Sequence, residues 1–108
     1  MSDSEFYATV YYGLMYWVYV LECEDKNWYI GYTSDLNKRL LEDQGGYGSK
    51  TTKKKENWKL IYCEGYLNMQ DAKGREVFLK SGSGRRFLKK QLRNYLGCRV
   101  FQLKLAHL

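Results

Sequence analysis

Two apolar segments on either side of a short polar turn constrain this chain more than any other feature. Residues 16–23 read YWVYVLEC and residues 28–32 read WYIGY, and both are rich in the β-branched and aromatic residues that favour strands. The four residues between them, EDKN, are typical of a turn. The sequence therefore predicts a β-hairpin at the start of the fold.

A helix and a third strand are predicted to follow the hairpin. Thr33 or Ser34 is expected to cap a helix over residues 36–43, with Asp35 in its first turn. The next residues, QGGYGSKTTKKKEN, are polar, basic and without periodicity, which indicates a loop. The segment WKLIYCEGY at 58–66 then has the composition of a strand.

Two further helices are predicted in the second half of the chain. Asn68 is expected to cap a helix that runs to about residue 80, and SGSG at 81–84 is expected to end it. RRFLKKQLRNYL at 85–96 predicts the last helix, and residues 98–108 are expected to form an added strand or a tail. The order β-β-α-β-α-α predicts an α+β fold, with a small three-stranded antiparallel sheet flanked by helices.

Charge indicates the class of partner. The formal net charge is +6, and no acidic residue follows Glu76. Clustered cations of this kind favour a polyanionic partner, nucleic acid first and a membrane surface second, although a merely solvated helix face is the alternative. The apolar run at 10–21 is too short to span a bilayer, and three cysteines without a CxxC pair indicate reduced thiols in a soluble cytoplasmic protein.

The hairpin carries two tyrosines and a glycine whose positions matter. If the register pairs odd-numbered residues with odd-numbered ones, Tyr19, Tyr29 and Gly31 share one face of the sheet. An aromatic pair that only packs would explain the two tyrosines. Gly31 favours a site, because a glycine within a strand often marks the close approach of a ligand or of another part of the chain.

Arg39 and Glu76 are the charged residues that ordinary packing explains least well. Arg39 lies near the apolar edge of its helix, where an ion pair with Asp43 is the simplest alternative role. Glu76 falls in a stripe at helical spacing that is expected to face inward, comprising Met69, Ala72, Glu76 and Leu79. A carboxylate there needs a partner, and the sequence leaves an arginine and a metal ion equally open.

These residues together could cleave a phosphodiester. Glu76 would hold one divalent ion whose shell is completed by water, which suits Mg²⁺. Arg39 would bind the phosphate and its transition state, and one tyrosine could relay a proton.

At this point the sequence resembles the GIY-YIG nuclease superfamily, over roughly residues 16–96. Tyr29, Ile30 and Gly31 form the YIG triplet, in the segment YIGYTSDLNKRL. The first half-motif corresponds to WVY at 17–19, of which only the tyrosine is retained. NWKLIYCE and GREVFLKSGSGRRFLKKQL resemble the small stand-alone bacterial members of this superfamily.

The resemblance implies a metal-dependent endonuclease that acts on DNA, or on RNA, with a role in DNA repair or recombination. Its catalytic residues would be Tyr19, Tyr29, Arg39 and Glu76, with Glu76 as the ligand of Mg²⁺ or Mn²⁺. Tyr19 would be the general base, and metal-bound water is the competing account. The nuclease domain would cover residues 15–97, between an extension at 1–14 and a tail at 98–108.

The sequence departs from the family pattern at three positions. Asp43 stands where many relatives have a histidine, Leu88 where some have an asparagine, and Tyr32 where some have a lysine. These departures give weight to an alternative, a nucleic-acid-binding module with weak or no catalysis.

A third hypothesis is an interaction domain whose tyrosine-rich face meets another protein. In the nuclease hypothesis, backbone contacts to DNA are expected from a set of basic residues and the strand glycine: Gly31, Lys50, Lys53, Lys54, Lys55, Arg86, Lys89, Lys90 and Arg93. No base-reading motif is evident, so low sequence specificity is expected.

Overall fold

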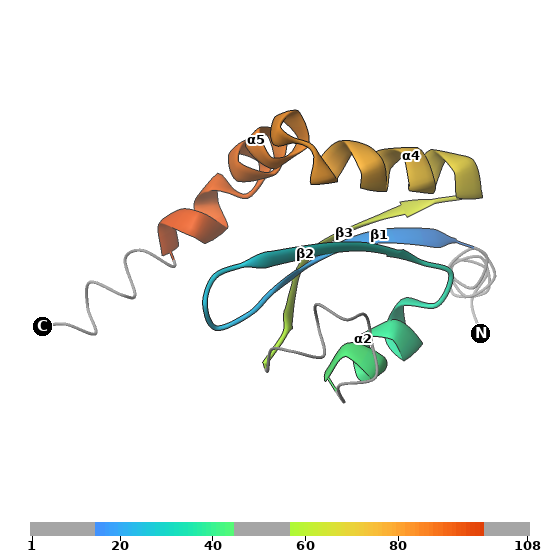
Figure 1. Ribbon diagram of the computed structural model, residues 1–108, viewed down its shortest axis with the longest axis horizontal. Helices are drawn as coiled ribbons and strands as arrows, with labels where there is room; N and C mark the ends of the chain where they lie inside the picture. The colour runs from blue at the N-terminus through green and yellow to red at the C-terminus, as the bar shows by residue number, and fades with distance from the viewer. Residues whose placement is uncertain (1–14, 45–56, 99–108) are drawn as a thin grey trace, which may run out of the picture. The chain divides into compact units, whose positions relative to one another are not determined.

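The computed structural model describes residues 15–44 and 57–98 (Figure 1). The elements in chain order are β1 (Tyr16–Glu22), β2 (Trp28–Thr33), α2 (Leu36–Gln44), β3 (Lys59–Tyr66), α4 (Met69–Lys80) and α5 (Gly82–Gln91). This order confirms the predicted α+β arrangement, a three-stranded antiparallel sheet with helices. Among these described residues, no helix is long and apolar enough to cross a membrane.

The described residues form two compact units, and the boundary between them falls inside α4, after Glu76. The first unit contains the sheet, α2 and the first two turns of α4. The second contains the end of α4, α5 and a short helical segment at residues 93–98. Of the tail predicted at 98–108, all but Cys98 lies outside the described residues.

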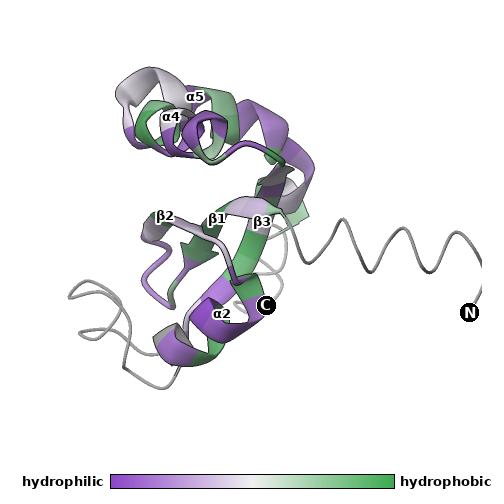
Figure 2. Ribbon diagram, turned by 90° about the vertical axis from the view of Figure 1, so that its right-hand side faces the viewer, coloured by the Kyte–Doolittle hydropathy of each residue, from purple (hydrophilic) through white to green (hydrophobic). Residues whose placement is uncertain are grey.

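The sheet has the strand order β2-β1-β3, so β1 is central and both its neighbours run antiparallel to it. Because a central strand is covered on both faces, the side chains of β1 are buried from Val18 to Glu22, and Val18, Tyr19 and Val20 are 0% exposed. Burying one such apolar side chain stabilises the fold by about 1.5–3 kcal/mol. In Figure 2 the ribbons of β1 and β3 each contain a stretch in the hydrophobic colour.

α2 packs on the face of the sheet that carries Tyr19. Leu36 of this helix belongs to one core cluster with Tyr19, Leu21 and the buried Trp58. The predicted cap of α2 was wrong by one or two residues. Asp35 caps the helix, because its carboxylate accepts the backbone N–H of Lys38 at 3.1 Å.

Thr33 has a different role at this junction from the one predicted. Its hydroxyl oxygen accepts the backbone N–H of Asp35 at 3.1 Å and so closes a tight turn. The turn leads directly from the end of β2 to the cap of α2. Strand and helix are therefore joined by only two residues, and the side chains of Thr33 and Asp35 hold this connection through local hydrogen bonds.

α4 begins as the sequence predicts and covers the opposite face of the sheet with its first turns. The side-chain oxygen of Asn68 accepts the backbone N–H of Gln70 at 2.8 Å. The predicted inward stripe is confirmed for Ala72 and Leu79, which are fully buried. It is wrong for Met69, the first residue of α4, which is 36% exposed.

A polar network joins α4 to β3. Glu64 stands opposite Val18 in the register, on the face away from Tyr19. Its carboxylate accepts two hydrogen bonds from Arg75, from Nε at 2.8 Å and from Nη2 at 3.1 Å. The hydroxyls of Tyr62 and Tyr66 donate to the same carboxylate at 2.8 and 3.1 Å.

The network changes the acidity of its members. Burial raises the pKa of Glu64, but the hydrogen bonds from Arg75 and the two tyrosines outweigh it, so that the pKa lies below its ordinary value. Burial, followed by the hydrogen bond to Glu64, raises the pKa of Tyr62 to about 12. Tyr62 is therefore a proton donor in a structural contact and is poorly suited to act as a base.

We expect this network to make stability depend on pH in acid. Because the pKa of Glu64 is lowered in the folded state, its stabilising effect is present above the ordinary value of 4.5 and is lost as the pH falls through the lower folded value. Thermal unfolding of wild type and Glu64→Gln should therefore differ most near neutral pH. A midpoint difference that stays constant down to about pH 3 would contradict this expectation.

The second unit begins with a close turn between α4 and α5, and here the sequence prediction needs correction. SGSG does not only end α4, because Ser81 caps α5 and the helix already begins at Gly82. A Cβ at Gly84 would lie 1.9 Å from the carbonyl oxygen of Phe78, so only glycine allows this approach. α5 ends at Gln91 instead of continuing to residue 96.

Candidate active site

Tyr19 is the centre of the candidate site. The register pairs it with Gly31 on β2 and places Tyr29 opposite Leu21, so odd-numbered residues pair with odd-numbered ones as expected. The phenol ring is fully buried and extends across Gly31. Its oxygen accepts a hydrogen bond from Nε of Arg39 at 3.1 Å. The structure thus brings a residue of the central strand into contact with one of α2.

Gly31 provides the space in which the Tyr19 phenol lies. A Cβ built at Gly31 would stand 2.5 Å from the Tyr19 oxygen and 2.6 Å from its Cζ. It would also stand 3.0 Å from Cε1 of Tyr29. The close approach that the sequence suggested at this glycine is therefore made by the protein's own tyrosine. A contact of Gly31 with DNA stays a prediction.

Tyr29 completes an aromatic group on the same face. Its ring centroid is 6.3 Å from that of Tyr19, with an angle of 46° between the rings. On its other side it meets Trp58 edge-on, with centroids 6.2 Å apart. These contacts hold the rings of both tyrosines in place. An aromatic pair that only packs would make the same contacts, so they do not distinguish a catalytic role from a structural one.

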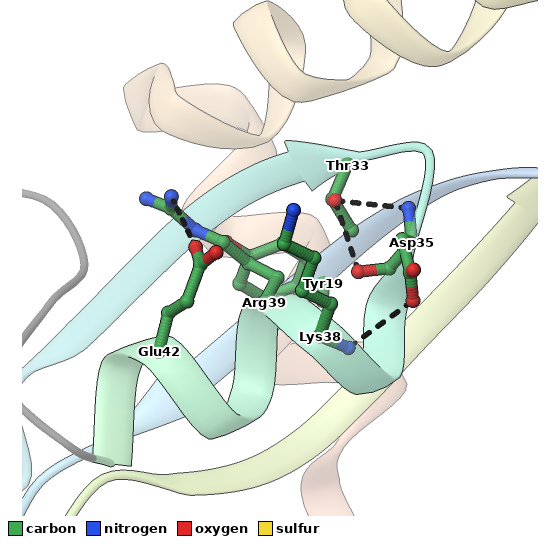
Figure 3. Close-up of polar contacts among 6 residues, drawn as sticks. All are labelled: Tyr19, Thr33, Asp35, Lys38, Arg39 and Glu42. Atoms are coloured by element: carbon green, nitrogen blue, oxygen red, sulfur yellow. Dashed lines mark hydrogen bonds and ion pairs between the residues drawn. The ribbon is translucent and has the colours of Figure 1, made fainter.

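Arg39 is held between Tyr19 and an acidic residue of its own helix. Its Nη1 lies 3.5 Å from Oε2 of Glu42, one turn further along α2 (Figure 3). Both side chains are about one third exposed or less, at 27% and 34%. The sequence suggested Asp43 as the partner, but the side chain of Asp43 lies outside the described ones. The spacing of three residues to Glu42 could have indicated this pair equally well.

A pocket opens beside Arg39, where β2 meets α2. It has a volume of about 230 Å³ and is lined by seven residues: Tyr32, Thr33, Ser34, Asp35, Lys38, Arg39 and Glu42. Two cations and two carboxylates line it, and Figure 3 shows most of these side chains around the start of α2. One carboxylate, that of Asp35, is committed to the helix cap, and that of Glu42 contacts Arg39.

Glu76 comes from α4, on the other face of the sheet from α2. It is half-buried and follows Lys73 by three residues, so both lie on the same side of the helix. Lys73 reaches β2, where its Nζ is 5.9 Å from the centre of the Tyr32 ring. The same strand therefore carries Tyr32 toward α4 and Gly31 toward α2.

The donor set around Glu76 decides which metal would fit. Within residues 15–44 and 57–98, no three histidine, cysteine or acidic side chains come together as a metal cluster. A single carboxylate fits an ion that keeps several waters and shares phosphate oxygens of a substrate, as Mg²⁺ does. It does not fit zinc, which needs three or four protein ligands.

The remaining predicted residues lie apart from this group in the chain or outside the described residues. Arg86, Lys89 and Lys90 are exposed on α5, and Arg93 is exposed just after it. These four belong to the second unit. The four lysines predicted in the basic loop lie outside the described residues: Lys50, Lys53, Lys54 and Lys55.

The departures from the family pattern can be placed for two of the three positions. Leu88 is fully buried in the second unit, where its role is packing. Tyr32 is half-buried and stacks against Tyr16, with centroids 6.3 Å apart and an angle of 15°. Sequence reasoning missed Arg75 and Glu64, although Tyr62, Glu64 and Tyr66 alternate along one face of β3 and could have indicated a polar group there.

Comparison with known proteins adds a family to this geometry. The model of the GIY-YIG catalytic domain matches residues 15–91. A UPF0213 protein of Streptococcus pneumoniae is 42% identical over 64 residues, which are 59% of this chain and 65% of that protein. A UPF0213 protein of Staphylococcus epidermidis is 34% identical over 74 residues, 68% of this chain and 90% of that protein.

One solved structure is also similar. It is the solution NMR structure of a UPF0213 protein from Bacillus halodurans, which has 32% sequence identity and a TM-score of 0.46. The match covers 75% of this chain and 84% of that one. For the relative from S. pneumoniae, slightly less than two thirds of its length is matched.

Proposed function

The chain belongs to the GIY-YIG catalytic domain family, and from this we propose that it is a divalent-metal-dependent endonuclease. Its substrate would be DNA, with RNA as the alternative, cut with low sequence specificity. The nuclease domain would comprise residues 15–97, with residues 1–14 as an extension and 98–108 as a tail. A role in DNA repair or recombination is part of the same proposal.

One observation supports this proposal above the others, the contact between Arg39 and Tyr19. A guanidinium held at 3.1 Å from a phenol oxygen, at the side of an open pocket, is preorganised to receive a phosphate. The guanidinium plane matches two phosphate oxygens at once. A phosphate that binds there would compete with Glu42 for the same cation.

In the reaction, the oxygen of water bonds to phosphorus and the bond from phosphorus to the leaving nucleoside oxygen breaks. The attacking water loses a proton and the leaving oxygen gains one. Arg39 would hold the phosphate and stabilise the charge that develops on its oxygens. Glu76 would hold the metal ion on the other side of the edge strand β2, whose Tyr32 both lines the Arg39 pocket and contacts Lys73 of α4. A bound divalent ion supplies further stabilisation of negative charge and helps to orient the water.

Tyr19 has two candidate roles in this reaction, to orient Arg39 or to act as the general base. The contact with Arg39 supports a role in orienting the guanidinium. The alternative is the role of general base, which the resemblance to the family implies. Since Tyr19 is 0% exposed and its oxygen accepts from Arg39, proton transfer from the attacking water to Tyr19 would require the Arg39 side chain to move aside.

The exposed cations of the second unit support nucleic acid as the partner. Arg86, Lys89, Lys90 and Arg93 would contact the phosphate backbone, as would the lysines of the 50–55 segment. Such contacts carry little sequence information. They would be shared by a nuclease and by a binding module without catalysis, so only cleavage distinguishes these two functions.

We expect Tyr19→Phe to lower the rate of DNA cleavage by about 10²-fold while the protein stays folded. The substitution keeps the packed ring and removes the oxygen that Arg39 contacts. The measurement is single-turnover cleavage of supercoiled plasmid with Mg²⁺ or Mn²⁺. Tyr16→Phe is the matched control, because it removes a phenol from the same strand on the other face.

The pH dependence of the rate separates the two roles of Tyr19. Loss of a general base changes the shape of the pH–rate profile, whereas loss of an orienting contact lowers the rate at all pH values. A Tyr19→Phe protein that cuts as fast as wild type would contradict both roles. A wild type that binds DNA in a salt-dependent way and never cuts it would leave the binding module as the function.

A further inference from the structure

The carboxylate of Glu64 is saturated by donors from two elements. Its Oε1 accepts Arg75 Nε and Tyr66, and its Oε2 accepts Arg75 Nη2 and Tyr62. The side chains of Arg75 and Glu64 are 24% and 18% exposed, so solvent competes only weakly for these contacts. A carboxylate that accepts two donors on each oxygen has a single favoured orientation.

The two hydrogen bonds from Arg75 to Glu64 form a fork, which fixes the orientation of the guanidinium as well as its distance from the carboxylate. Two parallel N–H···O bonds restrict both the direction and the rotation of the guanidinium, which a single point contact does not. Because Glu64 lies within β3 and Arg75 within α4, the fork fixes the first two turns of α4, which belong to the same unit as the sheet, along and around the helix axis. The two tyrosines hold the carboxylate end of the fork in place.

Glu76 is the residue that immediately follows Arg75 in α4. Successive residues of an α-helix are separated by about 1.5 Å along the axis and by about 100° around it. The position of the Glu76 backbone is therefore determined by the position of Arg75. A displacement of a reacting group by about 1 Å can lower a reaction rate by about 10²-fold.

We propose that Arg75 is a positioning residue, which holds α4 against β3 through Glu64 and so places the carboxylate of Glu76 for catalysis. This inference rests on the proposed nuclease function and names a residue that the function itself does not require. Arg75 would touch neither the substrate nor the metal. Its effect would be exerted through the orientation of Glu76.

The test compares Arg75→Lys with wild type in the full chain. Lysine keeps the charge but cannot form the fork. We expect the cleavage rate at saturating DNA to fall about 10- to 100-fold, while the midpoint of thermal unfolding shifts by a few degrees only. DNA affinity without divalent ions should stay unchanged. Arg85→Lys, an exposed site on α5, is the matched control.

Binding of Mn²⁺ gives a readout other than activity. Mn²⁺ broadens NMR signals of nearby nuclei, and we expect the Glu76 amide of Arg75→Lys to need about 10-fold more Mn²⁺ for the same broadening as in wild type. A double variant with the charges exchanged, Glu64→Arg with Arg75→Glu, should recover part of the lost rate. Recovery is expected because the double variant again places a guanidinium opposite a carboxylate, so that a fork can form between β3 and α4.

Three results would overturn the inference, and they can be told apart from failure of the proposed function. In the first, Arg75→Lys cuts DNA as fast as wild type and its Glu76 amide signal broadens at the same Mn²⁺ concentration. In the second, its loss of cleavage rate is fully explained by a loss of folded protein. In the third, the double variant Glu64→Arg with Arg75→Glu recovers none of the lost rate. In each case wild type still cuts DNA and Glu76 still responds to Mn²⁺. If wild type does neither, the nuclease function is refuted and the inference with it.

Discussion

Replacement of Glu76 by alanine is expected to abolish DNA cleavage, a loss of about 10³-fold or more, with little effect on folding. Glu76 is half-buried on α4, and among the described residues no cluster of three candidate metal ligands offers a substitute. The measurement is cleavage of supercoiled plasmid and branched DNA with Mg²⁺ or Mn²⁺, at equal concentrations of folded protein.

Asp71→Ala is the control for Glu76→Ala. It removes a carboxylate from the first turn of the same helix, where the side chain is exposed. We expect this variant to cut like wild type. Metal-dependent cutting that survives Glu76→Ala would refute the role of Glu76. If neither wild type nor Glu76→Ala cuts and both bind DNA alike, the protein is a binding module.

Gly31→Ala is expected to destabilise the fold and to lower cleavage at least about 10²-fold. A methyl group 2.5 Å from the Tyr19 oxygen forces the buried phenol to move away from its contact with Arg39. Overpacking of a core by one carbon costs about 1–3 kcal/mol. Urea unfolding would give the loss of stability, and single-turnover cleavage would give the loss of rate.

The same substitution at Gly74 provides the comparison. A Cβ at this exposed position of α4 would meet nothing within 4 Å. Gly74→Ala should therefore leave cleavage unchanged and stabilise the helix by about 0.5–1 kcal/mol. If Gly31→Ala were as stable and as active as Gly74→Ala, the position of the Tyr19 phenol over Gly31 would matter neither for stability nor for cleavage.

The fold could be predicted from the sequence because its local signals agree with each other. The alternation in the hairpin gives the register, since one face of β1 must hold Val18 and Val20 and the other must hold Tyr19. The capping details could not be predicted. Thr33, Ser34 and Asp35 are all good caps, and the choice between them depends on where the turn after β2 closes.

The residues that form the candidate site were easier to predict from the sequence than the contacts between them. Tyr19, Tyr29 and Arg39 were expected together and do lie together, because strand parity and helical spacing are local rules. Glu76 was expected with them but comes from α4, on the other face of the sheet. The link between Arg75 and Glu64 depends on how segments that are distant in the sequence pack. Periodicity within one element contains no information on such pairs.

The short connection between β2 and α2 restricts how many residues this segment can contain. Thr33 and Asp35 close the turn within the chain, and Arg39 follows one helical turn after the cap. One residue inserted or deleted here would rotate Arg39 by about 100° around the axis of α2 and away from the Tyr19 oxygen. The junction should therefore accept changes of side chain far more readily than changes of length.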